Sequence, residues 1–320
     1  MRRTAGALLV LTLGACTSVP PGPPVEIDVP PGSSLSSITD SLSAHHVIAG
    51  ATWFRLRGRL AGTDRHLQPG RYRFDPGASH QSILDRLARG DAIVTSLTLP
   101  EGATLWDFVR RATQRLELRP DSLWAALRDP ALLASYQIPG TSAEGWLLPE
   151  TFSFGRYATA RDVVRRFIGA RHDAWPPDWK ARADREDLDQ VEVLALASIV
   201  EAEAQLPEEL PIIAAVYRNR LRLGMPLQAD PTIQYAFLVD SGTRKSRLFN
   251  RDYAYASPYN SYLHPGLPPT PIGNPSTAAI EAVLSPAQVP YLYFVARGDG
   301  GHLFASSYAE HLRNIRRVRR

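Results

Sequence analysis

The sequence predicts an α+β chain, with a small N-terminal β/α domain followed by a larger mixed α/β domain. Three observations predict it. The length of 320 residues suffices for about two domains, each with its own core. A strand–turn–helix pattern recurs early in the chain, and helical stretches mix with short strands after it. The composition, 44% apolar and 21% charged, excludes a wholly disordered chain and a coiled coil.

The charge and cysteine content exclude several classes of function. The 36 Lys and Arg against 32 Asp and Glu give a net charge of +4, which is too small for this length to indicate a nucleic-acid partner. A single cysteine excludes an internal disulfide and a cysteine-based zinc site. No cluster of metal-ligand residues appears in the sequence, so we expect neither a metal nor another cofactor.

The N-terminus resembles a secretory signal, because Arg2 and Arg3 precede a short apolar stretch at 5–15. As a helix this stretch would span about 16 Å of the roughly 30 Å of bilayer hydrocarbon, so it is too short for a transmembrane anchor. The sequence around Cys16 resembles a bacterial lipobox, which predicts lipidation of Cys16; the alternative is an ordinary signal peptide with an incidental cysteine. We expect a signal peptide at 1–16, a tether at 17–24, and an envelope protein whose folded part lies outside the cytoplasm (periplasmic).

The first folded domain is expected at 25–112. Three Pro/Gly turns are each followed by a Ser or Thr and then an apolar helical stretch, which predicts helix N-caps at Ser34, Ser79 and Thr104. Small β/α units of this kind are common in carbohydrate-binding modules such as LysM. The alternative is that they are merely common turns.

The second domain is expected at 113–320. A helix is predicted over 189–205, with a capping box between Asp189 and Glu192 and a centre so apolar that it should be buried all round. A second helix follows Pro207, and Asp230 is expected to cap a third. A long loop over 241–275 and a hairpin near 291–305 complete the pattern.

Glu201 is the sharpest candidate for chemistry. It directly follows the apolar run, where lost solvation favours the protonated carboxyl that the general acid of glycoside cleavage requires. The alternative is that Glu201 is simply the first exposed residue after a buried helix. Glu203 lies about 200° further round a continuous helix, so it is expected to support the site or lie on the surface.

Candidate substrate contacts lie on later segments. Aromatic faces stack on sugar rings, and amide side chains bond hydroxyl and acetamido groups. On these grounds five residues are expected to bind a glycan: Gln228, Asp230, Tyr259, Asn260 and Tyr262. The alternative is that they cap a helix or pack a loop onto the core.

The order of several segments resembles one family. They begin with Glu144-Gly145-Trp146 and Leu196–Glu203, continue with Tyr217–Leu221, Met225–Thr232, Tyr259–Tyr262 and Gly266–Pro269, and end with Tyr291–Val295. Together they are similar to the bacterial endolytic murein transglycosylases, the YceG-like proteins, over nearly all of the chain after the tether.

The resemblance implies a lyase that acts on peptidoglycan glycan strands. It implies that Glu201 protonates the glycosidic oxygen between N-acetylmuramic acid and N-acetylglucosamine and then accepts the proton of the muramic acid C6 hydroxyl, which closes a 1,6-anhydro ring. Glu203 and Asn219 would support the site. Penicillin-binding proteins are implied as partners. The lipobox departs from the family's usual transmembrane helix, so the sequence does not determine whether the anchor lies in the inner or the outer membrane. The rival interpretations are a non-catalytic peptidoglycan-binding lipoprotein and a glycoside hydrolase.

Overall fold

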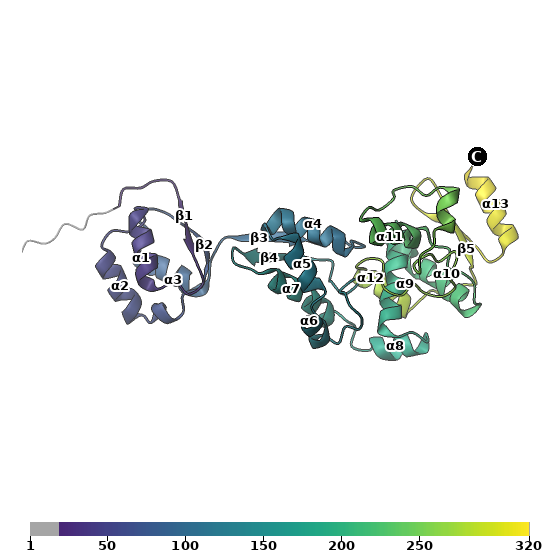
Figure 1. Cartoon of the computed structure of the whole chain (residues 1–320), viewed down its shortest axis with the longest axis horizontal. Coiled ribbons are helices and arrows are strands. Elements are labelled where there is room, and N and C mark those ends of the chain that lie inside the picture. The colour runs from purple at the N-terminus through teal and green to yellow at the C-terminus, as the bar shows by residue number, and fades with distance from the viewer. Residues whose placement is uncertain (1–18, 320) are drawn as a thin grey trace, which may run out of the picture. The chain divides into compact units, whose positions relative to one another are not determined.

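The computed structural model describes residues 19–319, which fall into two compact units (Figure 1). The first unit extends to Thr95 and also contains Gly155–Ala158. The second unit comprises Ser96–Phe154 and Thr159–Arg320. The chain therefore passes between the units three times.

The expected signal peptide, with its lipobox at Cys16, lies outside the described residues, as does the start of the expected tether. Across residues 19–319, no helix combines the length and the apolar character needed to cross a bilayer.

The first unit is a two-stranded antiparallel sheet covered by helices. The register pairs Val25 with Phe74 and Val29 with Gly70. The predicted N-caps Ser34 and Ser79 are confirmed, since each hydroxyl accepts a hydrogen bond from an amide of the following first turn. The elements in chain order are β1 (Val25–Val29), α1 (Leu35–Ala44), α2 (Ala51–Leu60), a 3-10 turn (Thr63–Arg65), β2 (Gly70–Phe74) and α3 (His80–Arg89).

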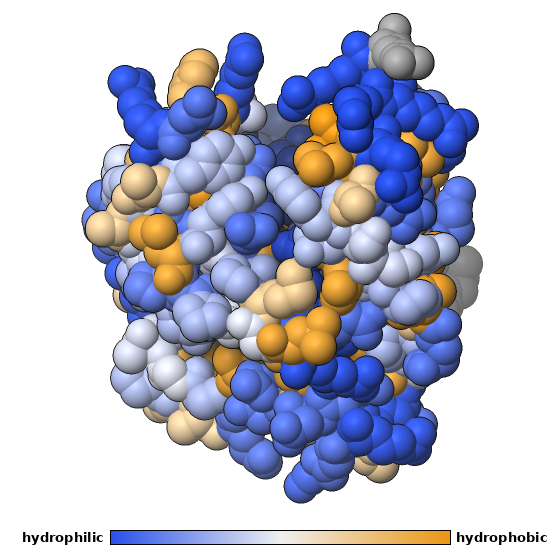
Figure 2. Space-filling view, turned by 90° about the vertical axis from the view of Figure 1, so that its right-hand side faces the viewer, coloured by the Kyte–Doolittle hydropathy of each residue, from blue (hydrophilic) through white to orange (hydrophobic). Residues whose placement is uncertain are grey.

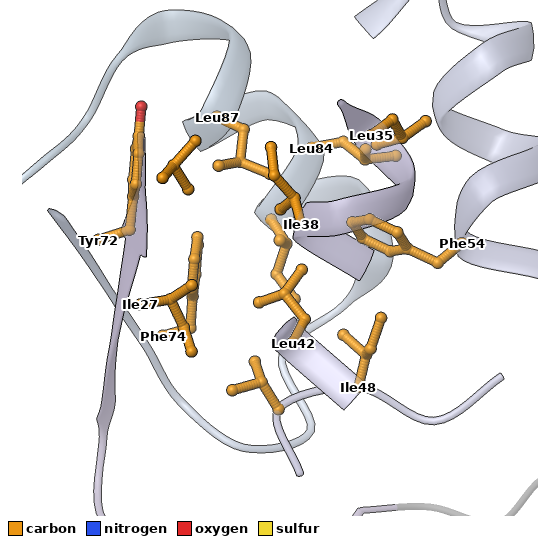
Figure 3. Close-up of a cluster of buried hydrophobic side chains, with 13 residues drawn as sticks. Ile27, Leu35, Ile38, Leu42, Ile48, Phe54, Tyr72, Phe74, Leu84 and Leu87 are labelled. Atoms are coloured by element: carbon orange, nitrogen blue, oxygen red, sulfur yellow. The ribbon is translucent and has the colours of Figure 1, made fainter. Parts of the chain in front are cut away.

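One apolar cluster fills the space between this sheet and its helices (Figure 3). Ile27 and Phe74 reach it from the strands, and Leu42 from α1. The inner face of α2 contributes Phe54 and Gly58. A Cβ at Gly58 would lie 2.6 Å from Leu35 Cδ2, so a larger residue there would require the Leu35 side chain to move.

The boundary between the units falls inside a strand. β3 (Val94–Thr98) pairs with β4 (Thr151–Gly155), and the first unit ends within β3 at Thr95, not at residue 112. The third strand–turn–helix copy therefore continues into the second unit. Its helix α4 (Leu105–Leu116) begins at the predicted cap Thr104 and packs on α5, which places it there.

The second unit is mainly helical. Besides α4 and most of β3 and β4, its elements are α5 (Pro120–Leu127), α6 (Pro130–Ser135), α7 (Ala160–Asp173), α8 (Trp179–Arg185), α9 (Gln190–Glu203), a 3-10 turn (Pro207–Glu209), α10 (Leu210–Arg222), α11 (Asp230–Ser241), a 3-10 turn (Asn250–Ala254), α12 (Thr277–Leu284), β5 (Tyr293–Ala296), β6 (His302–Ala305) and α13 (Tyr308–Val318). The predicted hairpin is confirmed as β5 and β6, which pair antiparallel.

Helix α9 is the centre of the second unit. Residues 193–200 are all buried, as the apolar run predicts, and α8, α10, α11 and α12 pack around them (Figure 1). The capping box between Asp189 and Glu192 is confirmed. The hydroxyl of Ser198 accepts a hydrogen bond from the amide of Ile272 at 3.0 Å, which ties the long loop to this helix.

The start of α11 differs from the expectation. Ala229, not Asp230, is the N-cap, and Asp230 is the first helical residue. Its carboxylate accepts hydrogen bonds from two tyrosine hydroxyls instead of capping the helix.

Candidate active site

A pocket of about 290 Å³ lies at the C-terminal end of α9. Of the five residues expected to bind substrate, Gln228, Asp230 and Tyr262 line it, and the glutamate beside them is Glu203, not Glu201. The pocket is lined by Glu203, Tyr217, Arg220, Gln228, Asp230, Tyr262, Phe294 and His311.

The helix geometry explains this separation of the two glutamates. α9 is regular through its last residue, Glu203, so side chains two positions apart point about 200° away from each other. Glu203 points into the pocket, and Glu201 therefore points away from it. The predicted divergence of the two side chains is confirmed, but the one that faces the pocket is Glu203 and the one that faces away from it is Glu201.

Glu203 has the environment of a proton carrier. Burial raises the pKa of Glu203 to about 7, and the charge of Asp230 acts in the same direction. Opposing them, the hydroxyl of Tyr217 donates a hydrogen bond to Glu203 Oε1 at 3.3 Å, and the charge of Arg220 favours the carboxylate. Because burial outweighs both, this carboxyl can release and recover a proton near neutral pH.

Asp230 is held by two phenols. Tyr262 donates to Asp230 Oδ1 at 2.7 Å, and Tyr253 donates to Oδ2 at 3.3 Å. Since it opens α11, Asp230 also lies where the helix dipole favours a negative charge. Both carboxylate oxygens are therefore oriented by the protein before any substrate binds.

Gln228 adopts a strained backbone conformation with its side chain exposed. Its φ is +51°, in the left-handed region that costs a residue other than glycine on the order of 1–3 kcal/mol. The conformation is fixed by the amide of Gln228, which donates to the carbonyl of Ser261 at 3.1 Å. Within residues 19–319 no hydrogen bond occupies its side-chain amide, which leaves that group available to a ligand.

Arg220 and Asn219 bond α10 to the chain that leads into β5, and Arg220 also to the segment before α11. Arg220 Nε donates to the carbonyl of Leu292 at 2.7 Å, and its Nη1 donates to the carbonyl of Leu227 at 2.6 Å. Asn219 Nδ2 donates to the carbonyl of Tyr291 at 3.0 Å. Asn219 therefore supports the pocket wall from behind and does not line it.

The structure does not bring Asn260 to the pocket as a substrate contact. Asn260 is fully buried, and its Nδ2 donates to the carbonyls of Tyr253 and Tyr255 at 3.1 and 2.8 Å. Its Oδ1 accepts from the amide of Tyr262 at 3.0 Å. Asn260 therefore holds the loop that presents Tyr253 and Tyr262 to Asp230, and because its side chain is fully buried and both of its N–H groups are bonded, it is not placed to contact a sugar.

Tyr259 is also absent from the pocket lining. Its hydroxyl shares a hydrogen bond of 2.8 Å with Thr270, and its ring packs edge-on against Tyr235. Tyr259 therefore packs its loop onto the core, which is the alternative to sugar stacking.

Glu201 lies in a different environment. Its Oε2 accepts a hydrogen bond from the amide of Ser276, the N-cap of α12, at 2.9 Å. A Cβ at Gly102 would lie 3.4 Å from Glu201 Cγ. Burial lowers the pKa of the Arg171 guanidinium to about 10, while the charge of Glu201 acts in the opposite direction. Glu201 thus holds α12 and offsets a buried cation.

Glu144 is a second buried carboxyl, and the sequence marks its segment without assigning the carboxyl a role. Its oxygens accept hydrogen bonds from the Leu105 amide at 3.2 Å, Tyr235 Oη at 3.0 Å and Asn274 Nδ2 at 3.2 Å. Burial raises the pKa of Glu144 to about 8. It joins four segments of the second unit outside the pocket.

Four pocket residues escape prediction from the sequence: Tyr217, Arg220, Phe294 and His311. Tyr217 belongs to the apolar stripe of α10, so periodicity assigns it to the core, where its ring is indeed buried. Its hydroxyl donates to Glu203, a contact that periodicity does not predict. Across residues 19–319, no group of three or more His, Cys, Asp or Glu side chains could hold a metal ion.

Comparison with known proteins finds a family and relatives that match most of the chain. The YceG-like family model matches residues 27–317. An endolytic murein transglycosylase of Bacillus subtilis (strain 168) is 29% identical over 302 residues, covering 90% of this chain and 82% of the relative. One of Streptococcus pneumoniae serotype 2 (strain D39) is 28% identical, but this chain spans only 58% of that relative.

A solved structure extends the likeness to three dimensions. The 2.6 Å crystal structure of a yceG-like protein from Listeria monocytogenes has a TM-score of 0.63 and 28% sequence identity, and the match covers 91% of this chain and 98% of that one. The mixed α+β architecture is therefore that of a known fold. Because the family model extends from β1 to the end of α13 and so includes every segment around the pocket, this chain belongs to the YceG-like family.

Proposed function

We propose that this chain is an endolytic murein transglycosylase, a lyase that cuts peptidoglycan glycan strands and leaves 1,6-anhydro ends, with Glu203 as its single acid and base. The observation that carries the proposal is the pocket in which Glu203, with its pKa raised to about 7, lies beside Gln228, Asp230 and Tyr262. The names of the curated relatives support the activity.

The reaction needs one carboxyl that works in both directions. Protonated Glu203 gives its proton to the glycosidic oxygen, and the bond from that oxygen to C1 of N-acetylmuramic acid breaks. The C6 hydroxyl of the same sugar then bonds to C1 and returns its proton to the Glu203 carboxylate. A pKa near neutrality suits both steps, because neither protonation state is strongly preferred.

The geometry is a reason to move this role from Glu201 to Glu203. A proton donor must come within hydrogen-bond reach of the scissile oxygen, and Glu201 is engaged by the Ser276 amide on the other side of α9. Glu203 is at the pocket.

A hydrolase is the second candidate, because the pocket holds two carboxylates, Glu203 and Asp230. In a hydrolase the second carboxylate activates a water or attacks the sugar. Both oxygens of Asp230 already accept phenol hydrogen bonds, which disfavours either role. Asp230 instead raises the pKa of Glu203.

A matched pair of variants tests the assignment. Glu203→Gln should lower the rate of anhydro-product formation by about 10²–10⁴-fold, the usual contribution of a general acid, with the fold intact. Glu201→Gln, two residues away on the same helix, should keep most activity per folded molecule. The measurement is mass spectrometry of digested murein sacculi, with circular dichroism to establish folding.

The outcomes separate all the candidates. Anhydro ends indicate a lyase, reducing ends indicate a hydrolase, and no cleavage by the unaltered chain indicates a binding lipoprotein. A folded Glu201→Gln protein without activity, beside an active Glu203→Gln protein, would return the acid role to Glu201.

The proposal extends to location and partners. A lipid on Cys16 would hold the chain at a membrane with its folded units outside the cytoplasm, and the first unit would serve as a LysM-like glycan-binding module. Nascent strands leave membrane-bound polymerases, so penicillin-binding proteins are the candidate partners. The support for this part comes from the signal-like N-terminus and from family membership.

A further inference from the structure

Helix α2 of the first unit carries an apolar face that nothing in residues 19–319 covers. Its inner face is buried at Phe54 and Gly58. On the outer face Trp53 is 55% exposed, Leu56 44% and Leu60 77%. With about 100° per residue, positions 53, 56 and 60 fall within one arc of about 60°, so the three side chains form a single stripe along the helix.

Arginines border this stripe on both sides. On the same helical projection Arg57 lies about 40° from Trp53, and Arg59 lies about 60° beyond Leu56 on the other edge. The Arg57 guanidinium carbon is 5.9 Å from the centre of the Trp53 ring. Arg59 has no ion-pair partner within residues 19–319.

The helix itself contains no acidic residue that would neutralise these charges. The third arginine, Arg55, pairs with Asp40 of α1 and so contributes less to the outer face. The surface therefore combines apolar side chains in the middle with free cationic charge at both edges.

We propose that this outer face of α2 lies on an anionic phospholipid surface, with Trp53, Leu56 and Leu60 in the interface and Arg57 and Arg59 on the lipid phosphates. An amphipathic helix with this pattern lies in the plane of a membrane, where long arginine side chains reach the headgroups. Tryptophan is also enriched at this depth. The inference goes beyond the proposed cleavage and does not depend on it.

Two other occupants fit less well. A second copy of this face would bring Arg57 and Arg59 of one chain against those of the other, and like charges repel. A glycan strand could stack a sugar on Trp53 and accept hydrogen bonds from the bordering arginines, but the exposed Leu56 and Leu60 would add only apolar contacts to a polar chain. By contrast, Figure 2 shows a face of the second unit on which hydrophilic residues predominate and apolar residues form only small separate patches.

The chain length is consistent with the same surface. Residues 17–24 separate Cys16 from β1, and fully extended they span at most about 30 Å. If Cys16 carries a lipid, the start of β1 stays within about that distance of the bilayer. Docking of α2 would then fix which side of the unit faces the membrane.

The test places an environment-sensitive fluorophore on α2 in the full chain. Cys16→Ser removes both the native thiol and the lipid, and Leu60→Cys supplies the labelling site. Ser82→Cys, at an exposed position on α3 of the same unit, is the matched control. The probe is vesicles of equal parts phosphatidylglycerol and phosphatidylcholine, with doxyl-labelled lipid as the quencher.

The expected result is a blue shift and quenching at position 60 but not at position 82. Arg57→Glu with Arg59→Glu should weaken vesicle binding about tenfold or more, since each arginine near an anionic surface contributes to affinity, whereas the double lysine variant should bind as the parent does. Any signal from the apolar N-terminus is common to all variants.

Three results would overturn the proposal. The first is no shift at position 60, or an equal shift at both positions. The second is a shift that grows with protein concentration without vesicles, which indicates self-association. The third is a shift that appears with murein glycan strands and not with vesicles, which indicates a sugar site. None of these outcomes depends on whether the chain cleaves peptidoglycan or on lipidation of Cys16.

Discussion

The hydroxyl of Tyr217 donates a hydrogen bond to Oε1 of Glu203 at 3.3 Å, and it joins the middle of α10 to the last residue of α9. The carboxyl at the end of this helix, whose centre is buried, is thereby held by a phenol that is itself buried. Two neighbours then act on the pKa of Glu203 in opposite directions, Tyr217 downward and Asp230 upward.

The first prediction concerns Tyr217→Phe. Loss of the hydroxyl removes a hydrogen bond that favours the carboxylate, so the pKa of Glu203 should rise above about 7. Protonated Glu203 starts the reaction, so kcat/KM falls as pH rises through this pKa. The alkaline limb of the kcat/KM profile should therefore move to higher pH. If the alkaline limb of a folded variant did not move, Glu203 would not be the group whose titration limits kcat/KM.

The second prediction concerns Asp230→Asn and has the opposite sign. The variant removes a negative charge that raises the pKa of Glu203, so the alkaline limb should move to lower pH. The asparagine can still accept from Tyr262, which limits structural change. Comparison of this profile with that of Tyr217→Phe on one substrate is an internal control, because general damage would not shift two limbs in opposite directions.

The third prediction concerns the strained residue Gln228. Gln228→Gly relieves a φ of +51° and should raise the free energy of unfolding by up to about 1 kcal/mol. The same change removes an amide from the pocket, so cleavage should fall, by about tenfold if one hydrogen bond to substrate is lost. Urea unfolding and product analysis measure the two effects. A variant with unchanged cleavage would remove Gln228 from the substrate site.

The fourth prediction concerns Glu144 and pH. Its pKa is raised from 4.5 to about 8, so the folded protein keeps a proton that the unfolded chain has released. The free energy of unfolding should therefore fall as pH rises from 4.5 to about 8, and this contribution should level off above that. Glu203, raised to about 7, adds to the same slope.

The Glu144→Gln variant isolates that contribution. Glutamine does not titrate, so the fall in stability between these pH values should become shallower than in the parent. The variant should also lose about 1–3 kcal/mol, because an amide nitrogen that cannot accept a hydrogen bond replaces one of the two carboxyl oxygens that now accept them. Equal slopes in the two proteins would contradict the raised pKa of Glu144.

The fifth prediction concerns the membrane anchor. If Cys16 is lipidated, a labelled fatty acid should be incorporated into the parent and not into Cys16→Ser. The variant should keep its activity on isolated sacculi, because the pocket lies wholly within the second unit. Absence of label in the parent would mean that the N-terminus is an ordinary signal peptide.

Elements with strong local signals could be predicted from the sequence, and contacts between distant residues could not. The capping box of α9 and the caps at Ser34, Ser79 and Thr104 depend on residues within one turn, so the pattern is sufficient. Helix α2 has no side-chain cap, since Gly50 precedes it, and its apolar residues are divided between two faces. The residue pattern of α2 therefore lacks the single apolar stripe by which an amphipathic helix is recognised in a sequence.

The candidate site shows the same limit more sharply. Periodicity predicts that Glu201 and Glu203 point in different directions, which the structure confirms. Which direction leads to the pocket depends on where α11 and the loop with Tyr262 pack, and helix periodicity carries no information about that. Asn260 is instructive for the same reason: an amide suited to a sugar is buried and bonded within the loop that contains it.

The passage of the chain between the two units limits how they can be separated. A deletion of the first unit up to Thr95 would divide β3, and it would leave the segment Gly155–Ala158 without the unit that it packs into. β4 would also lose part of its pairing partner and present a free strand edge, which favours aggregation. A shortened chain that fails would therefore say little about the role of the first unit. Point substitutions on the outer face of α2 leave every strand in place, and they are the better means of separating attachment from cleavage.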